Sequence, residues 1–183
     1  MSVTADVSAL LDRLVRDVED FPTPGVVFKD LSPLLADADA LRTVVGALAA
    51  AGRDASGATS VDTVVGLEAR GFILGAPVAL ELGTGFVPVR KAGKLPAGTH
   101  RVSYALEYGE AALEIHRDAL RPGDRVLVVD DVLATGGTAA AARTLVEACG
   151  ATVAGVAVLL ELAFLHGRAA LPGTTVSSLR VVT

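Results

Sequence analysis

Two adjacent carboxylates followed by a loop of small residues are the part of this sequence with the clearest chemistry. Asp130 and Asp131 come directly after four apolar residues, 126–129, and an alanine-rich run of high helix propensity follows at 139–142. This pattern predicts a buried strand, a tight loop and the start of a helix. The loop residues are Ala134, Thr135, Gly136, Gly137 and Thr138.

The loop at residues 134–138 is expected to bind an anion, because a helix start carries unpaired N–H groups and the positive end of the helix dipole. Glycines allow the backbone to approach that anion closely. The two carboxylates would repel a phosphate, but they can accept hydrogen bonds from a ribose diol or help to hold a cation. Loop and carboxylates together predict a site for a sugar phosphate.

Other phosphate-binding loops do not fit this stretch. It lacks the Gly-Lys-Ser/Thr of nucleoside-triphosphate loops and the G-x-G-x-x-G of dinucleotide sites. The remaining alternative is a plain strand–turn–helix unit whose aspartates only cap the helix.

An arginine follows a second predicted strand. Arg70 comes after the strand expected at residues 61–67, in a charged turn before an apolar helix at 72–82. Ligands of open α/β sheets gather at the carboxyl ends of the strands, so Arg70 could clamp a phosphate with two hydrogen bonds. The alternative is a surface ion pair between Arg70 and Glu68.

A basic loop follows the short strand expected at residues 86–90. It contains Arg90, Lys91 and Lys94, and so holds two of the three lysines of the chain. Clustered cations repel one another unless an anion binds between them. We therefore favour an anion-binding loop over the alternative of a solvated basic loop.

Composition restricts the class of protein. With 183 residues, 51% of them hydrophobic and 20% charged, the chain is most simply one globular domain rather than a disordered segment. The net charge of −5 and the 4% aromatic content argue against nucleic acid or a membrane as partner. A single cysteine, Cys149, and an N-terminus unlike a signal peptide lead us to expect a soluble cytoplasmic protein. The histidines have no ligand-like spacing, so no zinc site is expected.

Strands and helices alternate along the chain, which predicts an α/β fold: a doubly wound, mostly parallel sheet flanked by helices. An Asp37 cap starts the second helix, residues 26–30 form a loop, and residues 102–113 form a strand or hairpin. The last strand is expected at a sheet edge. The expected strands lie at residues 61–67, 86–90, 126–129, 152–162 and 175–182, and the expected helices at 7–18, 41–51, 72–82, 139–149 and 164–171.

Several segments resemble, in the same order, those of the adenine phosphoribosyltransferases within the type I phosphoribosyltransferases. They are FPTPGVVFKDLSPLL, GLEARGF, PVRKAGKLP, SYALEYG, LEIH and VVDDVLATGGT. The resemblance spans residues 21–162 and implies one phosphoribosyltransferase domain over residues 1–183. It also implies an N-terminal helix and base-binding hood at residues 1–35 and a mobile loop at 94–113 that closes over the site.

The reaction implied by the resemblance is purine salvage: adenine and 5-phosphoribosyl 1-diphosphate give AMP and diphosphate. Residues 134–138 would hold the 5-phosphate, and Asp130 and Asp131 would meet the ribose hydroxyls. Mg²⁺, carried mainly by the sugar diphosphate, would neutralise charge on the departing diphosphate. The cations that would assist there are Arg70, Arg90, Lys91 and Lys94.

By the same resemblance, Glu107 approaches N7 of adenine, either as a donor or as an acceptor of a proton. Spacing alone favours an exposed strand carboxylate at this position. Tyr108 would assist loop closure. The residues implied at the adenine are Val27, Phe28 and Lys29.

One position departs from what the resemblance implies, and one pair of residues carries a geometric condition. Lys29 stands where the family often has arginine, and lysine stacks less well on a purine. Neighbouring strand residues point to opposite faces, so Asp130 and Asp131 can both reach a ribose only if the strand has ended by Asp131.

The resemblance also implies a homodimer in which a cation reaches the partner subunit's site. Two alternatives to adenine transfer stay open. One is a phosphoribosyltransferase for another purine. The other is a non-catalytic regulator that senses phosphoribosyl diphosphate; such proteins usually carry a further DNA-binding segment and a basic surface.

Overall fold

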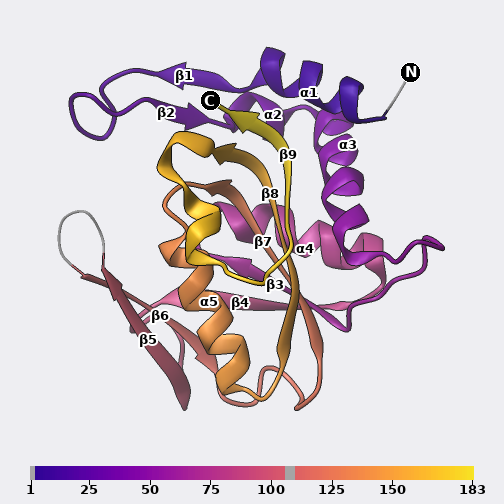
Figure 1. Cartoon of the computed structure of the whole chain (residues 1–183), viewed down its shortest axis with the longest axis vertical. Coiled ribbons are helices and arrows are strands. Elements are labelled where there is room, and N and C mark those ends of the chain that lie inside the picture. The colour runs from indigo at the N-terminus through magenta and orange to yellow at the C-terminus, as the bar shows by residue number, and fades with distance from the viewer. Residues whose placement is uncertain (1–2, 106–109) are drawn as a thin grey trace.

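The computed structural model describes residues 3–105 and 110–183, and it places a mixed sheet at the centre of the molecule (Figure 1). The strands of this sheet are Thr63–Leu67 (β3), Gly85–Lys91 (β4), Thr99–Ala105 (β5), Glu110–His116 (β6), Arg125–Leu133 (β7), Thr152–Leu162 (β8) and Val176–Val182 (β9). In the described residues their order is β5-β6-β4-β3-β7-β8-β9. In this order the neighbouring strands β4, β3, β7, β8 and β9 are all parallel to one another. Strand β6 pairs antiparallel with both β4 and β5. The predicted mostly parallel sheet, with β9 at an edge, is confirmed.

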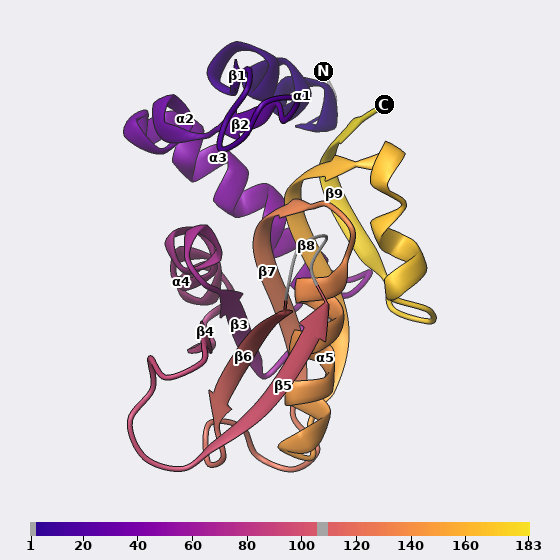
Figure 2. The same ribbon diagram turned by 90° about the vertical axis from the view of Figure 1, so that its left-hand side faces the viewer.

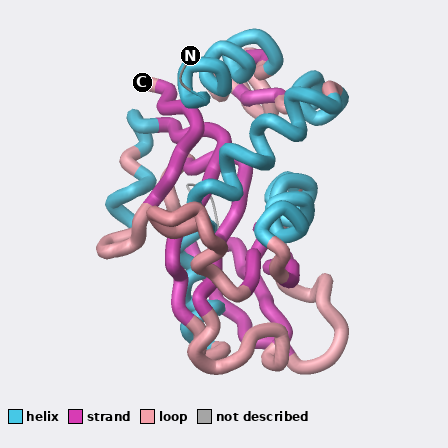
Figure 3. Tube along the Cα trace, turned by 90° about the vertical axis from the view of Figure 1, so that its right-hand side faces the viewer, coloured by secondary structure: helices cyan, strands magenta, loops and turns pink. Residues whose placement is uncertain are grey.

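Helices cover both faces of the sheet, as Figures 2 and 3 show from opposite sides. One face carries α1, α3 and α4, and the other carries α5. Among the described residues, no helix is both long and apolar enough to cross a membrane. The helices are Val3–Leu14 (α1), Ser32–Ala36 (α2), Ala38–Ala49 (α3), Arg70–Leu82 (α4) and Gly137–Ala148 (α5), with 3-10 turns at Ala50–Gly52 (η1), Ala163–Leu165 (η2) and Gly167–Ala170 (η3).

The central strand β7 takes part in two separate cores. Leu127 and Val129 pack with the helices of one face, whereas Val126 and Val128 pack with α5 on the other. All four side chains are fully buried. This is why β7 begins as a continuous apolar run instead of an alternating one. The site residues at its far end are therefore carried by a rigid strand.

The N-terminal region differs from the prediction. The opening helix ends at Leu14, and a short strand, Arg16–Val18 (β1), pairs antiparallel with Phe28–Asp30 (β2), where a loop was expected. Cross-strand ion pairs fix this hairpin: Arg16 Nη2 lies 2.7 Å from Asp30 Oδ2, and Lys29 Nζ lies 2.7 Å from Asp17 Oδ1. Strands of three residues are too short to show a period in the sequence.

Helix starts and ends also differ in places. Asp37 caps α3 as predicted, accepting from the N–H groups of Asp39 and Ala40 at 3.1 and 2.9 Å. The helix expected at residues 164–171 is wrong, because His166, at φ 53°, interrupts it and leaves the turns η2 and η3.

The carboxyl end of β8 is tied to its surroundings by a buried carboxylate, Glu161, which is 6% exposed. Arg168 donates to both of its oxygens, from Nε and from Nη2, each at 2.7 Å. The Ser178 hydroxyl on β9 donates to Oε2 at 2.7 Å. A bidentate guanidinium of this kind gives both strength and a defined orientation.

Acid should weaken this contact. The hydrogen bonds from Arg168, which outweigh burial, hold the pKa of Glu161 below its ordinary value. The stability that this lowering contributes is thus fully present above the unfolded-state pKa of about 4.3 and is lost as the pH falls through the lower folded-state value. We expect Glu161→Gln to be less stable than wild type at pH 7, with a difference that shrinks below about pH 4.3. Urea unfolding at each pH measures it, and a pH-independent difference would contradict the prediction.

Candidate active site

A cavity of about 450 Å³ lies at the carboxyl ends of β3 and β7, the edge where ligands of such sheets bind. It is lined from segments that are far apart in the sequence: the hairpin strand β2, the turn after β3, the end of β7 and the hairpin strands β5 and β6. The predicted site residues in its lining are Val27, Phe28, Lys29, Arg70, Lys91, Asp130, Asp131, Ala134 and Thr138.

Arg70, the first residue of α4, connects the two sides of this cavity. Its Nε lies 2.7 Å from Oδ2 of Asp131, and its Nη1 donates to the Lys29 carbonyl oxygen at 3.2 Å. Its Cζ lies 4.9 Å from the centroid of the Phe28 ring, in a cation–π contact. The alternative ion pair of Arg70 with Glu68 is therefore wrong. Instead, Arg70 links the N-terminal hairpin to the carboxylates of β7.

Asp130 and Asp131 both line the cavity, although the strand does not end there. The strand expected at residues 126–129 is longer in the structure, since β7 continues to Leu133. The register explains how both carboxylates reach the cavity: β3 pairs with β7 only as far as Val129, so one edge of β7 is left open beyond that residue.

The two carboxylates have different surroundings. Asp130 accepts a hydrogen bond from the backbone N–H of Asp131 at 2.9 Å. Burial, and then the charge of Asp131, raise the pKa of Asp130 well above its ordinary value. Oδ2 of Asp131 is buried, and the adjacent Arg70 Nε is not directed along a hydrogen bond to it. Both groups would gain from donors or a cation supplied by a ligand.

The loop of residues 134–138, hereafter the phosphate loop, has the predicted form of a turn leading into a helix. A smaller cavity of about 70 Å³ is lined by all five of its residues and adjoins the large cavity at Asp130 and Val132. Gly136 has φ 82°, in the left-handed region, and α5 begins at the next residue. The positive end of α5 therefore faces a small cavity beside the carboxylates.

The basic loop is only partly at the cavity. Lys91 lines it, whereas Arg90 and Lys94 are outside the lining formed by the described residues. Arg90 donates from Nε to Glu68 Oε2 at 3.2 Å and from Nη1 to the Lys94 carbonyl oxygen at 3.1 Å. Burial would raise the pKa of Glu68, but the hydrogen bonds from the Lys91 N–H and from Arg90 outweigh it, so the pKa is lowered. This ionised Glu68 fixes the start of the basic loop.

The hood residues present an apolar surface to the cavity. Val27 is 47% exposed, and the Phe28 ring packs edge-on against Phe21 with centroids 5.1 Å apart. The Lys29 side chain is engaged by Asp17, at 2.7 Å from Nζ to each carboxylate oxygen. The cation that stacks on an aromatic ring of the hood is Arg70, over Phe28.

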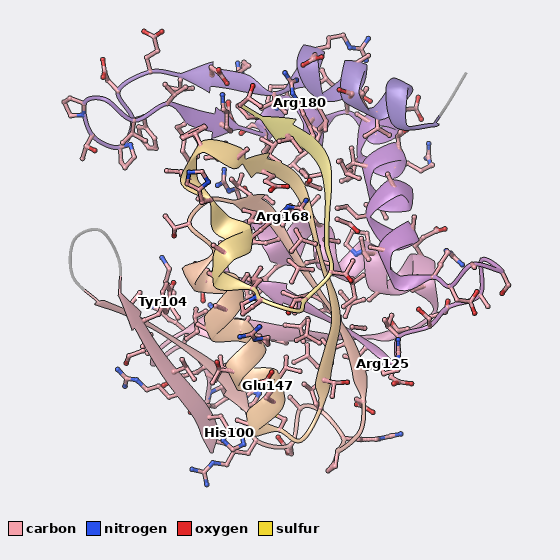
Figure 4. All side chains as sticks on the ribbon, in the orientation of Figure 1. His100, Tyr104, Arg125, Glu147, Arg168 and Arg180 are labelled. Carbon is pink, nitrogen blue, oxygen red and sulfur yellow. The ribbon has the colours of Figure 1, made fainter. Side chains whose placement is uncertain are left out.

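Tyr104 is a site residue that the sequence interpretation missed. It lies near the end of β5 (Figure 4) and lines the cavity, and its hydroxyl is 3.2 Å from that of Thr138. The only signal for it in the sequence was its place in the segment SYALEYG. Two predicted residues of that segment, Glu107 and Tyr108, lie outside the described residues.

Replacing Tyr104 by phenylalanine should weaken binding of a sugar phosphate without disturbing the fold. The ring stays, and only the hydrogen bond that orients the Thr138 hydroxyl is lost. We expect the Kd for ribose 5-phosphate to rise about two- to tenfold, the equivalent of one such bond. Isothermal titration calorimetry measures this change. An unchanged Kd would show that the Thr138 hydroxyl needs no such partner.

Comparisons with known proteins agree with this geometry. A family model described as a phosphoribosyl transferase domain matches residues 35–170. The chain is 67% identical over 169 residues to the adenine phosphoribosyltransferase of a Nocardioides species, covering 92% of this chain and 91% of that one. It is 57% identical to the adenine phosphoribosyltransferase of Thermobifida fusca, covering 98% and 100%.

A solved structure shares the fold and names its ligands. The Saccharomyces cerevisiae adenine phosphoribosyltransferase, complexed with adenine and an imino-altritol 1,6-bisphosphate, superposes with a TM-score of 0.90 at 39% identity, covering 96% of this chain and 99% of that one. That protein therefore accommodates a base together with a phosphorylated sugar analogue.

Proposed function

The chain belongs to the phosphoribosyl transferase family, and within it to the adenine phosphoribosyltransferases, and on this premise we propose that it transfers the 5-phosphoribosyl group of 5-phosphoribosyl 1-diphosphate to adenine. The products are AMP and diphosphate, so the enzyme acts in purine salvage. The observation that carries the proposal is that one cavity is lined both by the two aspartates with Ala134 and Thr138 of the phosphate loop and by the apolar hood residues Val27 and Phe28.

The phosphate loop and the two aspartates act on the sugar. The 5-phosphate binds at the N-terminus of α5, where backbone N–H groups of residues 134–138 and the Thr138 hydroxyl can donate to it. Asp130 and Asp131 accept hydrogen bonds from the ribose hydroxyls. The sugar is thereby held while bonds change at its anomeric carbon.

The base enters between the hood and the sugar. Val27 and Phe28 offer apolar contact to the purine, and backbone groups of Val27 and Lys29 read its edge. Adenine N9 bonds to the anomeric carbon as the bond from that carbon to the diphosphate oxygen breaks, and one proton leaves the base. We assign the proton contact at N7 to Glu107, by its place in the family motif.

The diphosphate departs toward the cationic side of the cavity. Arg70 and Lys91 line it directly, and Arg90 and Lys94 stand in the adjoining basic loop. Negative charge grows on the leaving group in the transition state, so these cations stabilise that state more than the bound substrate. Magnesium enters with the sugar diphosphate as part of the substrate and neutralises the same charge.

We further propose that the enzyme is a cytoplasmic homodimer. Ile73 and Leu80, spaced seven residues apart on α4, are 48% and 82% exposed, so one face of this helix presents two large apolar side chains to solvent. A second copy of the chain would cover them and bring its own basic loop near α4. Light scattering tests this: Leu80→Glu should shift the mass toward that of a monomer. The single cysteine, Cys149, suits a reducing compartment.

A base panel tests the reaction. Purified enzyme receives 5-phosphoribosyl 1-diphosphate and magnesium with adenine, guanine or hypoxanthine in separate assays, and release of diphosphate is measured. We expect turnover with adenine and little with the other two. Turnover of guanine or hypoxanthine alone would move the assignment to another purine. Binding of the sugar diphosphate without turnover of any base would instead support the sensing regulator.

Replacing Glu107 by leucine should lower kcat far more than it changes the KM for the sugar diphosphate. The leucine side chain can neither donate a proton to N7 nor accept one, and general acid–base catalysis contributes roughly 10²- to 10⁴-fold. Glu107→Gln is the matched variant, since it keeps the size and a hydrogen-bond donor. Steady-state kinetics with adenine distinguishes them, and a wild-type kcat in Glu107→Leu would remove this residue from the mechanism.

A further inference from the structure

The segment of residues 163–171, which contains η2 and η3, lies directly against the phosphate loop. A β-carbon added to Gly136 would collide with the Gly167 carbonyl oxygen, and one added to Gly167 would collide with that of Ala134. The two backbones therefore touch with no side chain between them. Gly167 cannot move toward the phosphate loop without displacing it, and if Gly167 moves away the loop loses the surface on which it packs.

Arg168 determines where Gly167 lies. Its guanidinium connects η3 with two strands: it donates two 2.7 Å hydrogen bonds to Glu161 of β8 and one from Nη1 to the Val176 carbonyl oxygen of β9 at 3.0 Å. Ser178 adds a further hydrogen bond to Glu161. His166, the residue before Gly167, is in the left-handed region, so local helix propensity does not stabilise this turn. The ion pair supplies that restraint instead.

Neither partner of this ion pair belongs to the site itself. Glu161 and Arg168 are absent from the described residues that line the two cavities, and nothing in the proposed reaction assigns them a role. Yet 3-10 turns are short and have poorer hydrogen-bond geometry than an α-helix, so this segment depends on tertiary contacts. The buried carboxylate at 6% exposure is costly unless its partner stays in place.

We propose that Glu161 and Arg168 are positioning residues for the phosphate loop: they hold Gly167 against Gly136 and thereby set the loop geometry that binds the sugar 5-phosphate. The inference rests on the proposed function only in naming the ligand. It specifies which substrate is affected, because the contact leads to the phosphate loop and not to the hood at Val27 and Phe28. The expected effect is on the sugar phosphate and not on adenine.

The test compares Arg168→Ala and Arg168→Lys with a matched control, Arg42→Ala. Arg42 also forms an ion pair with an aspartate, Asp39, but both are on the exposed surface of α3. Calorimetry measures the Kd for ribose 5-phosphate, and steady-state kinetics measures KM for each substrate. For Arg168→Ala we expect the Kd and the KM for the sugar diphosphate to rise about tenfold or more, since small displacements of a binding loop are costly.

The same variant should leave the KM for adenine within about twofold of wild type, well under the tenfold change that 1.4 kcal/mol would produce. Arg168→Lys, which keeps the charge but not the bidentate fork, should recover part of the affinity, and Arg42→Ala should match wild type. Loss of thermal stability with an unchanged Kd for ribose 5-phosphate would overturn the inference, as would an equal rise of both KM values.

Folding and function can be separated in this experiment. If circular dichroism shows that Arg168→Ala does not fold, the same measurements are made on Arg168→Lys and Ser178→Ala. Each of these variants weakens the hydrogen bonds to Glu161 without leaving this carboxylate unpaired. Wild-type and Arg42→Ala binding of ribose 5-phosphate without turnover of adenine would refute the proposed function but keep the inference. Absence of ribose 5-phosphate binding in the wild type would refute the phosphate loop assignment and the inference with it.

Discussion

Replacing Gly136 by alanine is expected to raise the KM for 5-phosphoribosyl 1-diphosphate by about 100-fold, the cost of displacing a binding loop by roughly 1 Å. Two effects combine at this residue. Its φ of 82° is unfavourable for a side chain, and a β-carbon would collide with the Gly167 carbonyl oxygen. The loop must move away from η3, which misplaces the N–H groups at the start of α5.

Gly57→Ala is the control for the first of these effects. Gly57 has φ 85°, close to that of Gly136, but a β-carbon there meets nothing within 4 Å. This variant should lose about 1–2 kcal/mol of stability and keep wild-type kinetics. Steady-state kinetics and thermal unfolding of both variants separate strain from collision. Wild-type KM in a folded Gly136→Ala would mean that the loop can bind phosphate in another conformation.

Replacing Arg70 by alanine should lower kcat by about 10²- to 10³-fold, the usual cost of removing one donor that stabilises transition-state charge. The structure adds a second reason. Arg70 pairs with Asp131, donates to the Lys29 carbonyl oxygen and stacks on Phe28, so it also aligns the sugar side of the cavity with the base side. Its loss leaves Asp131, 5% exposed, without its cation.

Arg70→Lys distinguishes charge from shape. Lysine keeps the positive charge but cannot reproduce the planar guanidinium that contacts Asp131, the Lys29 carbonyl oxygen and the Phe28 ring together. We expect a kcat between those of wild type and Arg70→Ala, with thermal stability measured alongside. A kcat for Arg70→Ala within about threefold of wild type would correspond to less than 1 kcal/mol and would exclude Arg70 from transition-state stabilisation.

The sequence predicted the strands that are buried on both faces of the sheet. The apolar runs around Val64, Val128 and Val158 predicted β3, β7 and β8, because a continuous apolar run of this length is typical of a parallel strand buried on both faces. The hairpin of β1 and β2 was not predicted, because three residues show no period and its register depends on ion pairs between residues more than ten positions apart.

The candidate site divides in the same way. The phosphate loop and its two aspartates were predicted because these residues are contiguous in the sequence. Their types and order alone indicate an anion-binding loop beside two carboxylates. Tyr104 was not predicted, because it acts through Thr138, a partner far away in the chain. A contact between residues so far apart in the sequence produces no local pattern from which it could be predicted.

By itself, the sequence determined that this chain forms an α/β sheet and predicted a sugar-phosphate site at the end of its central strand, since hydrophobic period and loop chemistry are local properties. Only the tertiary structure decided how that site is assembled. It paired Arg70 with Asp131 instead of Glu68, kept β7 extended to Leu133 while both aspartates reach the cavity, and set Gly167 against Gly136. The physical reason is that packing and ion pairing depend on distance in space, which the order of residues does not state.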